Sequence, residues 1–310
     1  MLAIFLQTLP FFLIIGLGFV AGRTGFFNEE ATAWLTRFVF YFALSAMLFR
    51  FAANLSLAEV LDWQFVTAYL CATGFVYLLV TGVAFLRGAR VEVAAFEAQC
   101  ATIGNVGFLG VPMLTLLMGE AAIGPVMLVL AVDLIFFGSL IVILITGARD
   151  GRMNIRILGT VGMGLLKNPM IVSIMLGLGW SALALPIPVV MNDFLSLLGG
   201  AATPGALFAI GASLAGKSAE RPFIAGWLSI CKLVLHPAAV ALSALWLFSV
   251  APYAAAVMIA AAALPVAGNV YILAQHYRVA PQRVSASILI STVAAVVSVS
   301  LVIGWVGALY

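Results

Sequence analysis

The sequence predicts an all-helical integral membrane protein, with ten transmembrane helices in two inverted five-helix repeats. The apolar composition, the spacing of the apolar segments and an internal repeat support this prediction. Of the 310 residues, 65% are hydrophobic and 8% are charged, against about a quarter charged in an ordinary soluble domain. Because these few charged residues cannot cover the surface of a water-soluble protein of this size, we expect most of the surface to face hydrocarbon.

The composition also excludes several classes of protein. A net charge of +3 without a basic run argues against nucleic-acid binding, and the apolar content argues against disorder. Cys71, Cys100 and Cys231 lie in apolar runs without metal-ligand spacing, so we expect buried free thiols. The chain has no Gly-rich phosphate loop, which excludes ATP hydrolysis.

Ten apolar segments, each about the length of a bilayer crossing, follow one another along the chain. The predicted spans are 3–22, 31–53, 64–86, 94–118, 121–146, 157–180, 189–215, 222–248, 252–275 and 284–308. The first lacks a basic n-region and a small-residue cleavage site, so it is expected to be a retained helix rather than a signal peptide.

The basic residues predict the orientation, because short cytoplasmic loops retain Lys and Arg. The loops after odd-numbered helices, together with the first part of the sixth span, contain 11 of the 14 basic residues, namely Arg23, Arg87, Arg90, Arg149, Arg152, Arg156, Lys167, Lys217, Arg221, Arg278 and Arg283. Both termini are therefore expected outside. A cytoplasmic linker at 147–156 would separate the first repeat (1–146) from the second (157–310).

The two halves of the chain share residues at nearly constant offsets. At an offset of 159, Pro10, Ile15, Gly18, Ala43, Leu48, Phe49, Ala53 and Leu55 match Pro169, Ile174, Gly177, Ala202, Leu207, Phe208, Ala212 and Leu214, and at 164 Gly104-Asn105-Val106 matches Gly268-Asn269-Val270. Five helices per half is an odd number, so the repeats would be inverted. Inverted repeats are typical of secondary transporters, although a duplication kept only for packing is the alternative.

The fourth and ninth predicted helices are interrupted at their centres. Glycines, an asparagine and a proline lie within 104–112, and Pro265, Gly268 and Asn269 lie in the ninth helix. Proline and glycine favour unwinding, and unpaired backbone at this depth is tolerated only beside a cavity. Two half-helix N-termini there would attract an anion, and Asn105 and Asn269 would add amide groups. Interhelical hydrogen bonds are the alternative role for either asparagine.

These motifs resemble the auxin efflux carrier family of bacterial permeases and plant PIN-type carriers. The resemblance covers essentially the whole chain. It is carried by the Gly-Asn-x-Gly-Phe-x-Gly-x-Pro stretch at 104–112, by Lys232-x4-Pro237, and by Leu264-Pro265, Asn269, Leu273-Ala274 and Tyr277. It implies that the fourth and ninth helices cross, and that helices 3–5 and 8–10 move as an elevator against a scaffold of helices 1, 2, 6 and 7. It also implies transport of organic anions such as malonate, malate or auxin across the plasma membrane.

By the same resemblance, Asn105 and Asn269 match the positions that hold the substrate carboxylate. The expected substrate contacts are Asn105, Asn269, Gly104, Val106, Gly107, Pro265, Gly268, Val270, Ser45 and Leu48. Ser45 departs from the family, which often has a proline there. A kink at this position is therefore in doubt, and the serine hydroxyl is an alternative contact with the site.

Ionisable residues inside membrane helices indicate function by default. Asp133 and Lys232 are expected at mid-depth, either as a structural ion pair or as a proton or ion relay. His236 shares a helix face with Lys232 and is either a pH-sensing or a packing residue. Glu97 lies near the cytoplasmic mouth as a vestibule charge or a solvated helix end.

A sodium- or proton-coupled transporter with a different substrate is the main alternative function. A cation exchanger would favour carboxylates at the two helix breaks, and neither break contains Asp or Glu. An enzyme would require a clustered nucleophile, base or metal set, so we expect neither catalytic residues nor a metal or cofactor. The expected partners are a small organic anion and membrane lipid, and a homodimer is a further candidate.

Overall fold

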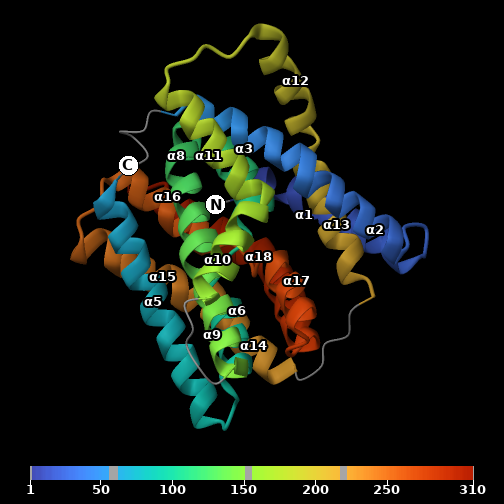
Figure 1. Ribbon diagram of the computed structural model, residues 1–310, viewed down its shortest axis with the longest axis vertical. Helices are drawn as coiled ribbons and strands as arrows, with labels where there is room; N and C mark the ends of the chain where they lie inside the picture. Colours follow the sequence, from blue (N-terminus) through green and yellow to red (C-terminus); the bar gives the residue numbers. More distant parts are fainter. Residues whose placement is uncertain (1, 56–61, 151–155, 217–221, 310) are drawn as a thin grey trace.

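The computed structural model describes residues 2–55, 62–150, 156–216 and 222–309. These residues are helical without a strand, and one isolated antiparallel bridge joins Gly104 and Val266. In Figure 1, α1, α2 and α13 lie towards the right and α3, α11 and α12 above the centre, whereas α5 and α15 lie towards the lower left, α16 on the upper left, and α6, α9 and α14 below the centre.

The first half of the chain forms the following elements. They are α1 (Leu2–Arg23), α2 (Glu29–Phe38), the π-helical turn η1 (Val39–Ala43), α3 (Leu44–Ala53), α5 (Trp63–Leu86), α6 (Val91–Thr102), the π-helical turn η2 (Val106–Gly110), α7 (Val111–Met118), the short η3 (Glu120–Ala122), α8 (Ile123–Val132), the π-helical turn η4 (Asp133–Phe137) and α9 (Gly138–Asp150).

The second half has similar lengths of helix. Its elements are α10 (Arg156–Lys167), α11 (Pro169–Ala182), α12 (Val189–Gly200), α13 (Ala202–Leu214), α14 (Pro222–Ile230), the π-helical turn η5 (Cys231–Leu235), α15 (His236–Leu242), the π-helical turn η6 (Ser243–Leu247), α16 (Pro252–Ala262), α17 (Gly268–Tyr277) and α18 (Pro281–Val306).

Seven helical segments of the described chain are long and apolar enough to cross a membrane. They match the first, second, third, fifth, seventh, eighth and tenth predicted spans. The fourth and ninth are interrupted, as predicted, and leave the shorter apolar helices Val106–Met118 and Pro252–Ala262. The chain is therefore a multi-pass membrane protein.

The sixth predicted span is not one straight helix, because α10 and α11 meet at 77°. Asn168 lies at the bend, where its side chain accepts a hydrogen bond from the Met170 N–H at 3.0 Å. Pro169 follows and has no N–H to donate to α10. Its repeat counterpart Pro10 lies inside the continuous helix α1, so the bend was not evident from the repeat.

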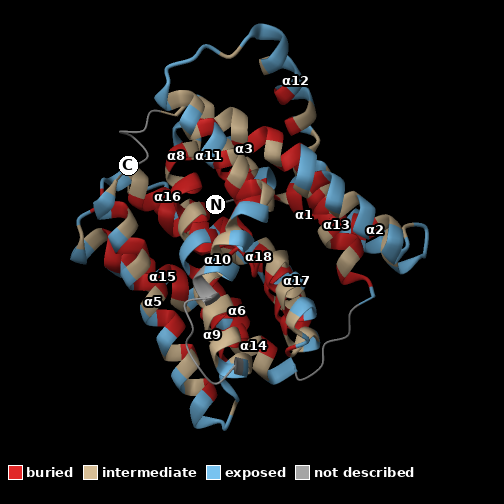
Figure 2. Cartoon of the chain, viewed as in Figure 1, coloured by how far each residue is buried: buried red, intermediate tan, exposed pale blue. Residues whose placement is uncertain are grey.

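The outer surface of the molecule is apolar, as expected for a surface that faces lipid. Large side chains such as Leu17, Phe75 and Trp246 are more than half exposed, and Figure 2 shows exposed residues along the outer helices and buried residues between them. Cys71 also lies on this outer surface, whereas Cys100 and Cys231 are buried. The prediction of burial was therefore wrong for Cys71, because a thiol on a lipid-facing helix needs no internal packing partner.

Candidate functional site

The breaks in the fourth and ninth spans are joined to each other through their backbones. The Asn105 N–H donates to the Pro265 carbonyl at 2.8 Å, and the Ala267 N–H donates to the Ile103 carbonyl at 3.1 Å. The Val266 N–H donates to Ser291 Oγ of α18 at 3.1 Å. Unwinding therefore leaves fewer free backbone groups than the sequence suggested, because the two breaks satisfy part of each other's hydrogen-bonding capacity.

We refer to the place where the two breaks meet as the crossing. Residue types there explain why the helices open. Ile103 ends α6 in an extended conformation, and Pro265 cannot donate a hydrogen bond. A Cβ atom on Gly104 would lie 3.3 Å from both the Ala261 carbonyl oxygen and Lys232 Nζ. The glycine therefore allows the two breaks and the lysine to approach closely.

A cavity of about 890 Å³ lies beside this crossing. Its lining comes from α6, η2, η4, α9, α10, α11 and α17, together with Thr36 and Phe40 of the second span. Asn269 and Val270 line the cavity, as does Gln99. This volume suits a small-molecule ligand.

The other expected substrate contacts do not line the cavity. They are Asn105, Gly104, Val106, Gly107, Pro265, Gly268, Ser45 and Leu48. Asn105 is 5% exposed and reaches the ninth helix through its backbone. The structure thus brings the two breaks together and places Asn269, but not Asn105, on the cavity wall.

Three of these residues have packing contacts that account for their positions. Leu48 is fully buried in the core. A Cβ on Gly107 would lie 2.6 Å from the terminal methyl of Met170. The Ser45 hydroxyl donates to the Phe40 carbonyl at 3.1 Å, so the expectation of a hydroxyl directed at the site was wrong. The preceding π-helical turn η1 leaves that carbonyl within reach of the serine.

Asp133 and Lys232 do not form a direct ion pair. The ion pairs of the described residues are Arg87–Glu97, Arg149–Glu92 and Arg283–Glu97. Asp133 Oδ1 accepts a hydrogen bond from the Tyr69 hydroxyl at 2.9 Å. Asp133 and Lys232 therefore have separate hydrogen-bond partners, and the direct ion pair expected as the structural role is not formed.

Lys232 instead donates a hydrogen bond to the C-terminal end of α16, the first half of the broken ninth span. Its Nζ donates to the Ala262 carbonyl at the C-terminus of α16 and lies 3.1 Å from His236 Nδ1. The other ring nitrogen of His236 lies 3.0 Å from Thr73 Oγ1. Lys232 and His236 are both fully buried, so this chain of contacts links α5 to the crossing and supplies a donor to a carbonyl that the break exposes.

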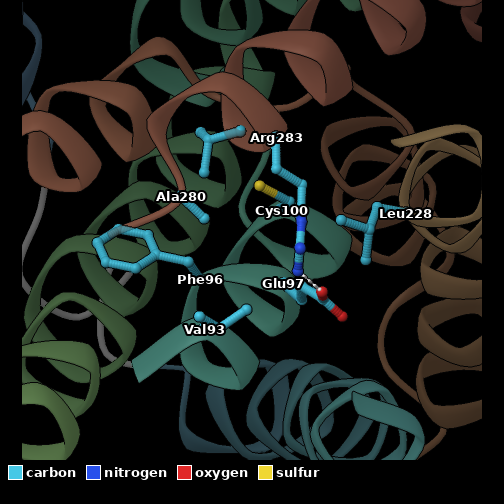
Figure 3. Close-up of a pocket in the computed structure, with 8 residues that line it drawn as sticks. Val93, Phe96, Glu97, Cys100, Leu228, Ala280 and Arg283 are labelled. Carbon is cyan, nitrogen blue, oxygen red and sulfur yellow. Dashed lines mark hydrogen bonds and ion pairs between the residues drawn. The ribbon is translucent and has the colours of Figure 1, made fainter. Parts of the chain in front are cut away.

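Glu97 is neither a vestibule charge nor a solvated helix end. It is 1% exposed, and its two carboxylate oxygens pair with Arg87 and Arg283. Figure 3 shows the Arg283 guanidinium directed at Glu97 beside Cys100. This ion-pair cluster joins the C-terminal end of α5 and the N-terminal end of α18 to the middle of α6.

Gln99 is a cavity residue that sequence reasoning missed. It is 2% exposed, and its Oε1 has no hydrogen-bond partner. An uncharged polar side chain six residues before Asn105, inside a predicted membrane helix, was the signal available. In the described part of the chain, no three His, Cys, Asp or Glu side chains are placed to hold a metal ion.

Comparisons with known proteins agree with a transport fold. A family model described as "Membrane transport protein" matches residues 3–303. The "Putative malonate transporter" of Rhizobium meliloti (strain 1021) is 30% identical over 298 residues, which cover 94% of this chain and 92% of that protein. The "Lysosomal cholesterol signaling protein" of Mus musculus is 27% identical over 227 residues, 69% of this chain but 26% of that protein.

Proposed function

The chain belongs to the membrane transport protein family of auxin efflux carrier-like transporters, and we propose that it is a secondary transporter of small organic anions such as malonate. The observation that carries this proposal is the cavity beside two broken helices that are hydrogen-bonded to each other. The similarity to the rhizobial "Putative malonate transporter" supports a dicarboxylate as substrate. Malate and auxin-like acids share the carboxylate and are the other candidates.

The start of α17 is the part of the cavity wall best suited to an anion. The first N–H groups of a helix have no partner within it and carry a partial positive charge. Asn269 is the second residue of α17 and lines the cavity. A carboxylate there would accept hydrogen bonds from these N–H groups and from the Asn269 amide. Asn105 would act from the opposite break, where its backbone already bonds to Pro265.

The proposed transporter has ten membrane-spanning segments in two inverted repeats and works by an elevator motion. Helices α1, α2, α3, α10, α11, α12 and α13 would form the scaffold, and the remaining helices would carry the cavity across the membrane. The close contacts between α1 and α13 and between α11 and α3 support this division. We also propose a location in the cell membrane with both termini outside. Membership of a transporter family favours transport over catalysis.

Uptake of labelled malonate, malate and indole-3-acetate by proteoliposomes tests the function. Loss of a hydrogen bond to a charged group costs about 1.5–3 kcal/mol, so Asn269→Ala and Asn105→Ala should each weaken apparent affinity roughly 10- to 100-fold. Asn54→Ala is the matched control, because Asn54 bonds to the Arg50 carbonyl at the end of α3, away from the cavity. Unchanged affinity in both site variants would reject the proposed contacts, and uptake of none of the three anions would reject the substrate class.

A further inference from the structure

Three side-chain oxygens of cavity-lining residues are buried without a hydrogen-bond partner in the described chain. They are Gln99 Oε1, Asp133 Oδ2 and Asn269 Oδ1. Gln99 and Asp133 are 2% and 3% exposed. Buried acceptors are normally satisfied, and leaving them unpaired is costly. Three of them in residues that line one cavity therefore indicate a ligand.

Other contacts determine which oxygen atoms are left over. Asp133 Oδ1 already accepts from Tyr69, so Oδ2 is the unpartnered oxygen. The Gln99 amide nitrogen lies 3.5 Å from the Phe137 carbonyl, and rotating the amide would bring two acceptors together. Phe137 follows Asp133 by four residues, so Gln99 contacts the same turn of the fifth span that carries the carboxylate.

The charge of this group determines the kind of ligand. All three atoms are acceptors, and they carry one formal negative charge. Lys232 donates no hydrogen bond to these oxygens, because its Nζ is engaged by His236 and the Ala262 carbonyl. If Asp133 were protonated, its hydroxyl could donate to one of the other two oxygens, and the third would still lack a partner. A coordinated cation can contact all three oxygens. Carboxylate and amide oxygens are ligands for hard cations, and a single charge suits a monovalent ion.

We propose that Gln99, Asp133 and Asn269 form a binding site for Na⁺. The cavity has room for the cation and a small anion side by side. Where the proposal extends to coupling, it rests on the proposed function. With Na⁺ bound, Asp133 no longer repels an organic anion at the start of α17, and Asn269 can contact the cation through Oδ1 and the anion through its NH₂ group. Anion and Na⁺ would then cross the membrane together.

Ion binding can be measured without transport. The Tm of the purified full-length chain is compared in equal concentrations of NaCl, KCl and choline chloride. A ligand that binds only the folded state raises stability, so NaCl should raise the Tm by about 2 °C or more relative to choline chloride. Asp133→Asn keeps an acceptor for Tyr69 but removes the charge, and it should abolish the increase. Gln99→Leu should reduce it.

Glu120→Gln is the matched control, because it removes one carboxylate from an exposed position outside the cavity, and it should keep the full response to Na⁺. Equal Tm values in the three salts, or an equal Na⁺ response in Asp133→Asn, would overturn the site. Malonate uptake driven by an inward Na⁺ gradient tests the coupling. If Na⁺ stabilises the wild type but no anion is transported, the site stands and the proposed function fails. If uptake follows a proton gradient and ignores Na⁺, the proposed function stands and the coupling to Na⁺ is wrong.

Discussion

Gly18 of α1 lies directly against the backbone of Phe208 in α13, so that a Cβ atom on Gly18 would stand 2.1 Å from the Phe208 carbonyl oxygen. The repeat offset of 159 relates Gly18 to Gly177 and Phe49 to Phe208. A Cβ on Gly177 would stand 2.6 Å from the Phe49 carbonyl oxygen. The two halves therefore exchange equivalent contacts, which is the pattern that the proposed inverted repeats would produce.

We predict that Gly18→Ala and Gly177→Ala each destabilise the protein. The atom that a new methyl group would meet is backbone oxygen, which cannot move away by a rotamer change. Overpacking a helix contact costs about 1–3 kcal/mol, and the two helices would have to separate. Thermal unfolding in detergent should show a lower Tm for each variant.

Gly16→Ala is the control for this prediction. Gly16 lies in the same helix, but a Cβ there would meet nothing within 4 Å. Alanine is the better helix former by about 0.5–1 kcal/mol, so the Tm should be unchanged or higher. If all three variants had the same Tm, the close contact of α1 with α13 would be wrong.

The sequence was sufficient for the features that depend on residue type. Hydropathy predicted the membrane-spanning segments, and the proline and glycine residues predicted the breaks at Gly104 and Pro265. It could not reveal that the breaks would bond to each other, because the bridge of Gly104 with Val266 depends on tertiary packing. It also missed the bend at Asn168, since Pro10 occupies the equivalent place in a continuous helix.

We predict a loss of stability in Glu97→Gln. The carboxylate is buried and pairs with Arg87 and Arg283. Removing one partner of a fully buried ion pair costs about 3–5 kcal/mol, and the cost here should be smaller, because the Arg87 and Arg283 side chains are 35% and 15% exposed. The variant should unfold at a lower temperature than the wild type. Arg90→Gln alters an exposed residue of the same region and should leave the Tm nearly unchanged, and equal stability of Glu97→Gln and Arg90→Gln would contradict a structural role for the cluster.

Lys232→Met is predicted to abolish transport, with or without a second substitution at Asp133. Methionine fills a similar volume but offers no donor to the Ala262 carbonyl at the break. An unsatisfied buried carbonyl costs about 1–3 kcal/mol, which is enough to disturb the crossing. Because Lys232 and Asp133 have separate partners, the double variant Lys232→Met/Asp133→Asn should not recover malonate uptake. Recovery would show that the two charges matter to each other, as in a direct pair.

The candidate site was predictable only in part. Asn269 was identified because its Gly-Asn-Val motif recurs in both halves, and it lines the cavity. Gln99 has no counterpart of this kind, and only the fold shows that it shares a cavity with Asp133. Neutral side chains in apolar helices carry little signal, since the same residue can serve packing or binding. Asp133 and Lys232 were recognisable as unusual, but their separate hydrogen-bond partners depend on Tyr69 and the break in the ninth helix.

Cysteine labelling is predicted to confirm the orientation derived from the basic loops. Phe26 lies in the connection after α1, close to Arg23, and is 87% exposed, whereas Leu183 follows α11 on the opposite face and is 70% exposed. In a Cys71→Ala background, a membrane-impermeant maleimide added to intact cells should label Leu183→Cys but not Phe26→Cys. Cys100 and Cys231 are buried and should not react. Opening the cells should expose Phe26→Cys to the reagent. The reverse pattern would place both termini in the cytoplasm. The 11 basic residues would then lie outside, which would contradict the orientation predicted from the retention of positive charge in short cytoplasmic loops.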